Sequence, residues 1–245
     1  MKALIAGAGI AGLATGIALR QAGLEVEVFE RSHELREIGA GLMIWPNGAR
    51  SLQALGVEST ALAVQQISLC SWRGRELIKY PIQAISERFG SDVAFVHRAD
   101  LQMALARSFG GDRLHLGVGV RAFKEGHAEV QVIMDDGTVA SGDLLVGADG
   151  LRSPVRRQLL EDGDPFYLGS TIWRGILDSG SMPLSQGAGV DWFGRGSEFV
   201  AFHLTGDRIY WAGVTKEPQG EKPGPGGHKT DLIQRSAAGS SRYLH

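Results

Sequence analysis

The chain has 245 residues, of which 43% are hydrophobic and 21% charged, so it is long enough to bury a core and is not a disordered tail. Its formal net charge of -2, with no sustained Lys/Arg run interleaved with aromatic residues, argues against nucleic acid as a partner. The single cysteine, Cys70, excludes an internal disulfide framework and a cysteine-based metal site, which favours a reducing compartment, with the cytoplasm as the default.

The chain begins with an apolar run that resembles a secretory signal peptide. Glycines interrupt this run, no small-residue cleavage site follows it, and no stretch approaches about 18 consecutive apolar residues. We therefore expect neither a leader peptide nor a membrane-spanning helix.

The first predicted elements are a buried strand over residues 3–6 and a helix over residues 10–22, separated by glycines. Gly7 permits the tight turn from strand to helix, Gly9 lets the backbone approach a pyrophosphate, and Gly12 allows close packing. The amino end of the helix then faces the anion. The alternative is a βαβ turn that binds nothing. The predicted cofactor-binding residues of this loop are Gly7, Gly9, Ile10, Ala11 and Gly12.

A second strand is predicted over residues 24–29, and Glu30 follows it, eighteen residues after Gly12. A carboxylate in this place accepts hydrogen bonds from the ribose hydroxyls of an adenosine and repels a 2′-phosphate. The pattern therefore predicts FAD or NAD rather than NADP.

Further along, helices are expected near residues 49–55 and 98–109, and Asp-Asp-Gly at 135–137 predicts a turn between strands 129–134 and 139–141. From about residue 165 the pattern changes to a β meander with Gly-containing turns. The segment 67–97 is expected to add strands to that sheet. The side chains expected to face inward from this segment are Leu69, Trp72 and Ile78.

The stretch GDLLVGADGLRSPVR at residues 142–156 distinguishes FAD from NAD. It resembles the second fingerprint of the flavin-dependent aromatic monooxygenases, the family that includes salicylate, urate and para-hydroxybenzoate hydroxylases. In that family the turn that contains Asp149 lies near the flavin ribityl chain. Three further segments match the family in the expected order: Glu30-Arg31, the run from residue 39 through Gly41, Leu42 and Met43, and the R-x-x-L helix start at Arg98. A strand over residues 114–120 would place the backbone of Val120 at adenine, although an ordinary strand valine is the alternative.

The resemblance implies an α/β fold with a Rossmann-type FAD-binding domain and an inserted, mostly antiparallel β-sheet substrate domain. We expect residues 1–66 and 98–164 to form the first and residues 67–97 and 165–218 to form the second. Residues 219–245 are expected to be a loop and an incomplete C-terminal segment, because the family's third fingerprint is missing from them.

The resemblance also implies the chemistry. NADH or NADPH reduces FAD, O₂ adds to give a flavin C4a-hydroperoxide, and an aromatic small molecule is hydroxylated. The protein excludes water and positions the substrate. No metal is expected, and the oligomeric state stays open.

The candidate substrate contacts lie on the predicted meander. Tyr210 is placed to hydrogen-bond a ring hydroxyl, Arg174 to pair with a carboxylate, and His203 to act as a base. For each, ordinary sheet packing or exposure is the alternative. Glu198 lies in a region where urate-type relatives carry an arginine, which argues against urate.

Two other hypotheses remain. The first is that the chain is another flavin oxidoreductase on the same scaffold, such as a reductase, epoxidase or halogenase. The second is that it is an FAD-binding fragment without catalytic activity.

Overall fold

The computed structural model describes residues 1–35, 40–58, 61–194, 196–220 and 230. Most of the predicted C-terminal segment, and residue 39 of the predicted flavin segment, lie outside these ranges. No helix among the described residues has both the length and the apolar character needed to span a bilayer.

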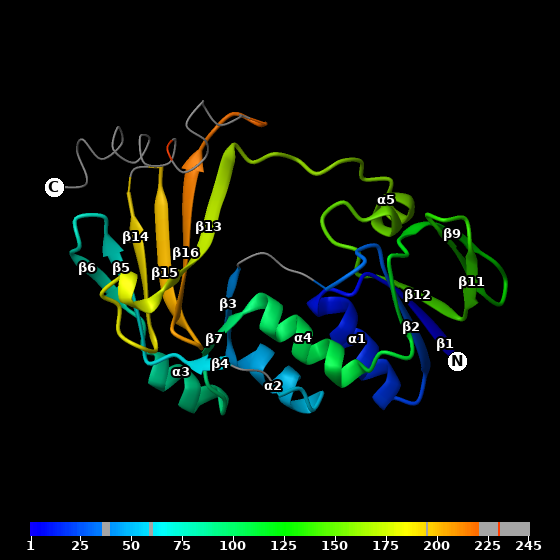
Figure 1. Cartoon of the computed structure of the whole chain (residues 1–245), viewed down its shortest axis with the longest axis horizontal. Helices are drawn as coiled ribbons and strands as arrows, with labels where there is room; N and C mark the ends of the chain where they lie inside the picture. The colour runs from blue at the N-terminus through cyan, green and yellow to red at the C-terminus, as the bar shows by residue number, and fades with distance from the viewer. Residues whose placement is uncertain (36–39, 59–60, 195, 221–229, 231–245) are drawn as a thin grey trace.

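A parallel sheet forms the core of the part that contains the N-terminus, drawn at the right of Figure 1. Its strand order is β12-β1-β2-β8. The four strands are β1 (Lys2–Ala6), β2 (Glu25–Glu30), β8 (Leu114–Leu116) and β12 (Leu144–Gly147).

Alternating side chains bury both faces of this sheet. Ile5 and Val28 point into a core with α1 (Ile10–Gln21) and α4 (Arg98–Phe109), while Leu4 and Phe29 point into a second core. A three-stranded antiparallel sheet and α5 (Pro154–Leu160) cover the second face. The strands of this small sheet are β9 (Val120–Glu125), β10 (Val130–Met134) and β11 (Val139–Gly142). Two covered faces explain the continuous apolar run of residues 3–6 in β1, whereas β2 alternates between glutamate and apolar residues.

The predicted hairpin is confirmed. β10 pairs antiparallel with β11, Gly137 has a φ of 88°, and the Thr138 backbone N–H donates to Asp136 Oδ1 at 2.9 Å. The strand expected over residues 114–120 is shorter than predicted. β8 ends at Leu116, and Val120 already begins β9 in the neighbouring sheet.

A six-stranded sheet forms the other side of the molecule, with strand order β13-β16-β15-β14-β5-β6 (Figure 1). A short 3-10 helix at Ser179–Ser181 leads out of β13. The strands are β5 (Gln66–Ser71), β6 (Glu76–Lys79), β13 (Ser170–Asp178), β14 (Ala188–Phe193), β15 (Glu198–Leu204) and β16 (Arg208–Lys216).

This sheet departs from the predicted meander in two ways. Within the predicted meander β14, β15 and β16 pair in chain order, but β13 pairs with β16, and β14 pairs in parallel with β5. The prediction that Ile78 faces inward is wrong, because Ile78 is 51% exposed on the edge strand β6. Leu69 and Trp72 are half-buried.

A small antiparallel sheet, β3-β7-β4, lies between the two large parts and is flanked by two helices. β7 falls within the predicted insert 67–97, yet it pairs with β3 and β4 rather than with the six-stranded sheet. Phe95 of β7 stacks on Phe202 at 4.2 Å between ring centroids, which joins this sheet to β15. The elements are β3 (Gly41–Ile44), α2 (Pro46–Ala54), β4 (Ala61–Ala63), α3 (Ile82–Phe89) and β7 (Ala94–His97).

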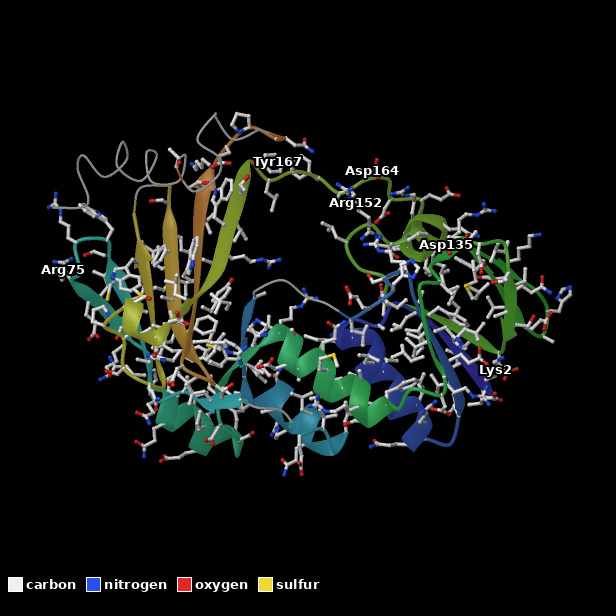
Figure 2. All side chains as sticks on the ribbon, in the orientation of Figure 1. Lys2, Arg75, Asp135, Arg152, Asp164 and Tyr167 are labelled. Atoms are coloured by element: carbon white, nitrogen blue, oxygen red, sulfur yellow. The ribbon has the colours of Figure 1, made fainter. Side chains whose placement is uncertain are left out.

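The chain crosses from α5 to β13 through a linker that carries Asp164 and Tyr167 (Figure 2). The Tyr167 hydroxyl donates to the Glu217 carbonyl oxygen at 2.8 Å. This contact fixes the end of the linker to the chain just after β16.

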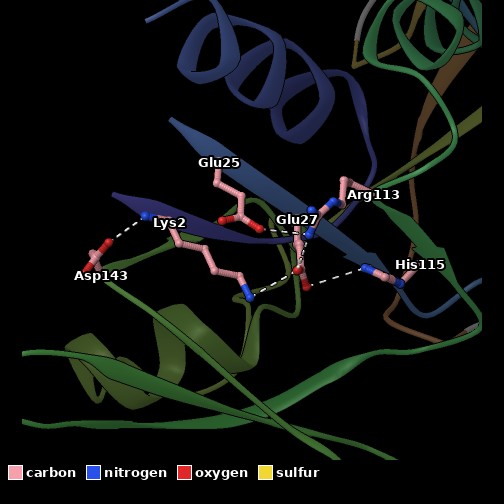
Figure 3. Close-up of polar contacts among 6 residues, drawn as sticks. All are labelled: Lys2, Glu25, Glu27, Arg113, His115 and Asp143. Atoms are coloured by element: carbon pink, nitrogen blue, oxygen red, sulfur yellow. Dashed lines mark hydrogen bonds and ion pairs between the residues drawn. The ribbon is translucent and has the colours of Figure 1, made fainter. Parts of the chain in front are cut away.

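A charge network fastens the strands of the parallel sheet to one another (Figure 3). The side chain of Glu27 is 14% exposed. Its carboxylate oxygens lie 3.1 Å from Lys2 Nζ, 3.0 Å from Arg113 Nη1 and 3.5 Å from His115 Nε2. Burial raises the pKa of Glu27, but hydrogen bonds and the positive charge from Lys2, with His115 and Arg113, outweigh burial and hold this pKa below its ordinary value.

Candidate functional site

The glycine-rich turn after β1 leaves no space for side chains on its inner side. Gly7 has a φ of 97°, and a Cβ on it would overlap the Ala148 carbonyl oxygen. A Cβ on Gly12 would overlap the Gly7 carbonyl oxygen. Gly9, in contrast, has no atom within 4 Å of where its Cβ would be, so its backbone faces open space. The turn is therefore packed tightly inside and open on the side where a phosphate group would approach.

Helix α1 begins directly behind this turn without any capping side chain. Its N-cap residue is Gly9, no side chain caps it, and its first turn contains no acidic residue. The first backbone N–H groups of a helix have no intrahelical acceptor and carry a partial positive charge. Ile10, Ala11 and Gly12 supply these groups here, and they suit an anion such as a pyrophosphate.

Glu30 lies at the end of β2 beside the same turn. Its Oε2 accepts from the Ala8 backbone N–H and its Oε1 from the Ser32 backbone N–H, both at 2.9 Å. The carboxylate is thus held next to the glycine turn, where an adenosine ribose is expected. Arg31, its neighbour, is exposed.

The second glycine-containing turn abuts the first. Gly7 packs against Ala148 and the Cα of Asp149, and the Ala148 backbone N–H donates to the Ala6 carbonyl oxygen at 2.8 Å. The Asp149 carboxylate accepts from the Ser153 hydroxyl and from the Val155 backbone N–H. Asp149 therefore lies at the glycine turn, on the same side of the sheet, and its side chain also fixes the start of α5.

The segment Gly41-Leu42-Met43 forms β3 between the glycine turn and the six-stranded sheet. A Cβ on Gly41 would lie 2.6 Å from the Phe202 and Tyr210 rings, so only glycine fits there. Arg98 begins α4, and its backbone N–H donates to the Ala40 carbonyl oxygen at 2.8 Å. Two of the segments expected to contact the flavin, the one that leads into β3 and the start of α4, are thus joined directly.

Val120 lies near the Glu30-Arg31 part of this group, because the Val118 backbone N–H donates to the Glu30 carbonyl oxygen at 2.9 Å and Gly119 packs against Arg31. The Val120 side chain is 8% exposed in the core beneath the parallel sheet, and it pairs with Met134 across β9 and β10. Its assignment to adenine stays a prediction.

The three candidate substrate residues do not share one face of the six-stranded sheet. Tyr210 pairs with Ile176, and Arg174 pairs with Ala212, so Tyr210 and Arg174 are diagonal neighbours on the face that Gly41 contacts. His203 pairs with Ile209 and points to the opposite face, where it is 4% exposed and its Nε2 contacts the Leu184 carbonyl oxygen. The structure brings Tyr210 and Arg174 together and separates His203 from them.

Tyr210 and Arg174 also interact electrostatically. Burial raises the pKa of the Tyr210 phenol, and the positive charge of Arg174 offsets part of that rise. Within the described residues neither side chain has a hydrogen bond or ion pair, and Arg174 is exposed. Arg174 is therefore open to a ligand, whereas Tyr210 is only 8% exposed and packs on Phe202.

The sequence reasoning missed Gln102 on α4. This side chain is 6% exposed, its Nε2 donates to the Ala8 carbonyl oxygen at 2.8 Å, and its buried Oε1 has no hydrogen-bond partner among the residues that the structure describes. A buried amide with an unused acceptor next to the glycine turn suits a ligand hydroxyl or a water molecule. The sequence feature that could have indicated this residue is a polar glutamine between the buried apolar residues Leu101 and Ala104 of the helix.

Comparisons with known proteins agree with this arrangement. Residues 1–163 match the model of a family described as an FAD binding domain. The aurachin C monooxygenase/isomerase of Stigmatella aurantiaca is 37% identical over 243 residues, which cover 96% of this chain and 62% of that protein. The 3-amino-4-hydroxybenzoate 2-monooxygenase of Streptomyces cremeus is 30% identical over 258 residues, which cover 98% of this chain and 65% of that protein.

A solved structure shows the same arrangement of elements. The crystal structure of Klebsiella pneumoniae HpxO complexed with FAD and uric acid has a TM-score of 0.86 at 29% identity, covering 98% of this chain and 62% of that chain. The chain thus spans about three fifths of the length of the relatives it matches.

Proposed function

This chain belongs to the FAD-binding domain family, and we propose that it is the cofactor-binding and substrate-facing part of an FAD-dependent monooxygenase. The reaction we propose is hydroxylation of an aromatic or related small molecule with NADH or NADPH and O₂. The names of the two similar monooxygenases support this reaction class.

The described residues fit FAD by several independent features. The amino end of α1 and the open backbone at Gly9 would hold the pyrophosphate, and Glu30 would accept hydrogen bonds from the adenosine ribose. Gln102 offers its unpartnered Oε1 beside the turn, and the backbone at Asp149 lies on the opposite flank of Gly7. When bound, a flavin supplies the redox and oxygen-activating chemistry of the proposed reaction.

One observation carries the proposal. Gly41, in the segment expected to contact the flavin, packs directly on Phe202 and Tyr210 of the six-stranded sheet. The predicted cofactor site and the predicted substrate face are therefore in van der Waals contact. A substrate lying on the sheet beside Tyr210 would lie next to the cofactor segment, as hydroxylation requires.

Tyr210 and Arg174, on the face of the six-stranded sheet that Gly41 contacts, have separate roles in substrate binding. The Tyr210 hydroxyl is protonated at neutral pH, and burial raises its pKa further, so it would act as a hydrogen-bond donor or acceptor for a ring oxygen. Arg174 supplies a planar, permanently charged fork for a carboxylate or a phenolate oxygen. A positive charge there stabilises the phenolate form, in which the ring is more electron-rich. We assign no part in the reaction to His203, because it faces the other side of the sheet.

The sequence supports two narrower proposals. At the first glycine motif, Glu30 would repel a 2′-phosphate, which favours FAD there. The sequence shows no second dinucleotide motif, so we propose that the nicotinamide cofactor binds only transiently. A cytoplasmic location is proposed on the single free cysteine, Cys70, which is buried.

The test uses the purified full chain. We expect a yellow protein with bound flavin, NADH or NADPH consumption that rises on addition of a suitable phenol, and a product that carries one oxygen atom from labelled O₂. Nicotinamide consumption without oxygen insertion would replace hydroxylation by another flavin-dependent reaction. A colourless protein that cannot be reconstituted with FAD would refute the proposal.

A further inference from the structure

Gly119 lies where two distant segments meet beside the predicted ribose site. The Val118 backbone N–H donates to the Glu30 carbonyl oxygen, and the Asp135 backbone N–H donates to the Gly119 carbonyl oxygen, both at 2.9 Å. The chain after β2, the start of β9 and the turn after β10 are therefore held side by side.

The adenine of a bound dinucleotide is expected at this place. A ribose carries its phosphate on C5′ and its base on C1′, so the base lies beyond the ribose as seen from the phosphate. With the pyrophosphate at the glycine turn and the ribose at Glu30, the adenine would therefore lie beside Arg31 and Gly119. Asp135 lies at the end of the parallel sheet away from Lys2, which is the end where β1 runs into the glycine turn (Figure 2).

Two opposite charges approach the same side of Gly119. A Cβ on Gly119 would lie 2.7 Å from Asp135 Oδ2 and 3.0 Å from the Arg31 Cβ, so both side chains border the one point where Gly119 has no side chain. Both side chains are exposed. Among the residues that the structure describes, neither side chain makes an ion pair or a hydrogen bond, not even with the other. The carboxylate of Asp135 is thus accessible and unused beside the expected adenine.

The chemistry of adenine fits such a carboxylate. The exocyclic N6 amino group of adenine is a hydrogen-bond donor, and an ionised carboxylate is an acceptor only. A purine with an oxygen at this position would instead present an acceptor to Asp135, so two acceptors would face each other without a proton between them.

We propose that Asp135 recognises the adenine of FAD by accepting a hydrogen bond from N6, and that it thereby selects a 6-amino purine over a 6-oxo purine at this end of the cofactor. This inference rests on the proposed function, because it assumes that FAD is the bound dinucleotide. It assigns Asp135 a part in cofactor specificity and none in the reaction itself.

The test compares FAD with its deaminated analogue, in which hypoxanthine replaces adenine. The full chain, freed of flavin, is titrated with each dinucleotide in a calorimeter, without turnover. We expect FAD to bind about tenfold more tightly, as one hydrogen bond to a charged group provides. In Asp135→Asn the side-chain amide can donate to the 6-oxo group as well as accept from an amino group, so the preference should fall to about twofold or less. Because N1 of the analogue also gains a proton, this fall is the decisive result.

Asp136→Asn is the matched control. Asp136 is the exposed neighbour of Asp135, but its Oδ1 accepts from the Thr138 backbone N–H at 2.9 Å and from the Thr138 hydroxyl at 2.7 Å. Its replacement removes the same charge and should keep the full preference for FAD. Both variants change an exposed residue next to Gly137, so they should fold, and circular dichroism checks this.

The outcomes separate the inference from the proposed function. Equal binding of the two dinucleotides by the unchanged protein, a preference that survives Asp135→Asn, or one that is lost equally in Asp136→Asn would overturn the inference and leave FAD binding intact. Binding of neither dinucleotide would refute the proposed function, and the inference with it.

Discussion

Replacing Asp191 by asparagine should make the protein more stable near neutral pH. The change keeps the size of the side chain and removes a carboxylate that burial and Glu198 disfavour. An asparagine amide would also donate a hydrogen bond to Glu198, whereas two ionised carboxylates repel each other.

The size of the effect follows from the proton affinity of Asp191. A rise in its pKa from 3.8 to about 6 corresponds to about 3 kcal/mol against the ionised folded state at neutral pH. Asp191 is only half-buried, so solvent screening reduces this to about 1–2 kcal/mol. For a chain of this size that is a rise in Tm of about 2–8 °C.

The stabilisation by Asp191→Asn depends on pH. A carboxyl group whose pKa is raised in the folded state stabilises the fold at low pH, and this contribution is lost as the pH rises from 3.8 to about 6. The advantage of Asp191→Asn should therefore be full at about pH 8 and about half as large at about pH 5.

Thermal unfolding followed by circular dichroism at these two pH values measures the effect, with Asp178→Asn as the control for removing an exposed acid from the same sheet. A Tm of Asp191→Asn at or below that of the unchanged protein at about pH 8 would refute the reasoning. An equal gain at both pH values would do the same.

Three further predictions concern the cofactor site and the parallel sheet. Gly12→Ala should abolish flavin retention and lower the Tm, because a Cβ there overlaps the Gly7 carbonyl oxygen; a variant that still purifies yellow contradicts this. Glu30→Lys should lose FAD while circular dichroism shows the fold intact, and unchanged retention would remove the ribose assignment. Glu27→Gln should lower the free energy of urea unfolding by about 1–2 kcal/mol at neutral pH. That difference should shrink as the pH falls below the ordinary Glu27 value of 4.5, since the native carboxylate is held at a lowered pKa; a constant difference would argue against the charge network.

The glycine turn, helix α1 and the position of Glu30 follow from sequence because their geometry is local. The turn needs glycine at Gly7 and Gly12 for steric reasons that a few neighbouring residues determine. The DDG hairpin is predictable for the same reason, since its turn residues dictate the conformation.

The substrate face is not predictable in that way. Alternation correctly puts His203 on one face with Ala201 and Phe199, but it does not say which face meets the cofactor segment. Both faces of the sheet bury side chains, so hydrophobicity does not distinguish them. The pairing of β13 with β16 and of β14 with β5 decides the matter, and these contacts join distant parts of the chain.

The same distant pairing has a consequence for biosynthesis. During translation β5 and β6 leave the ribosome long before β14 exists, and β1 must wait for its partner β12. Until then, apolar strands with unpaired backbone edges are open to pairing with other nascent chains. We therefore expect the yield of native protein to depend on chaperone supply and growth temperature more than on its final stability.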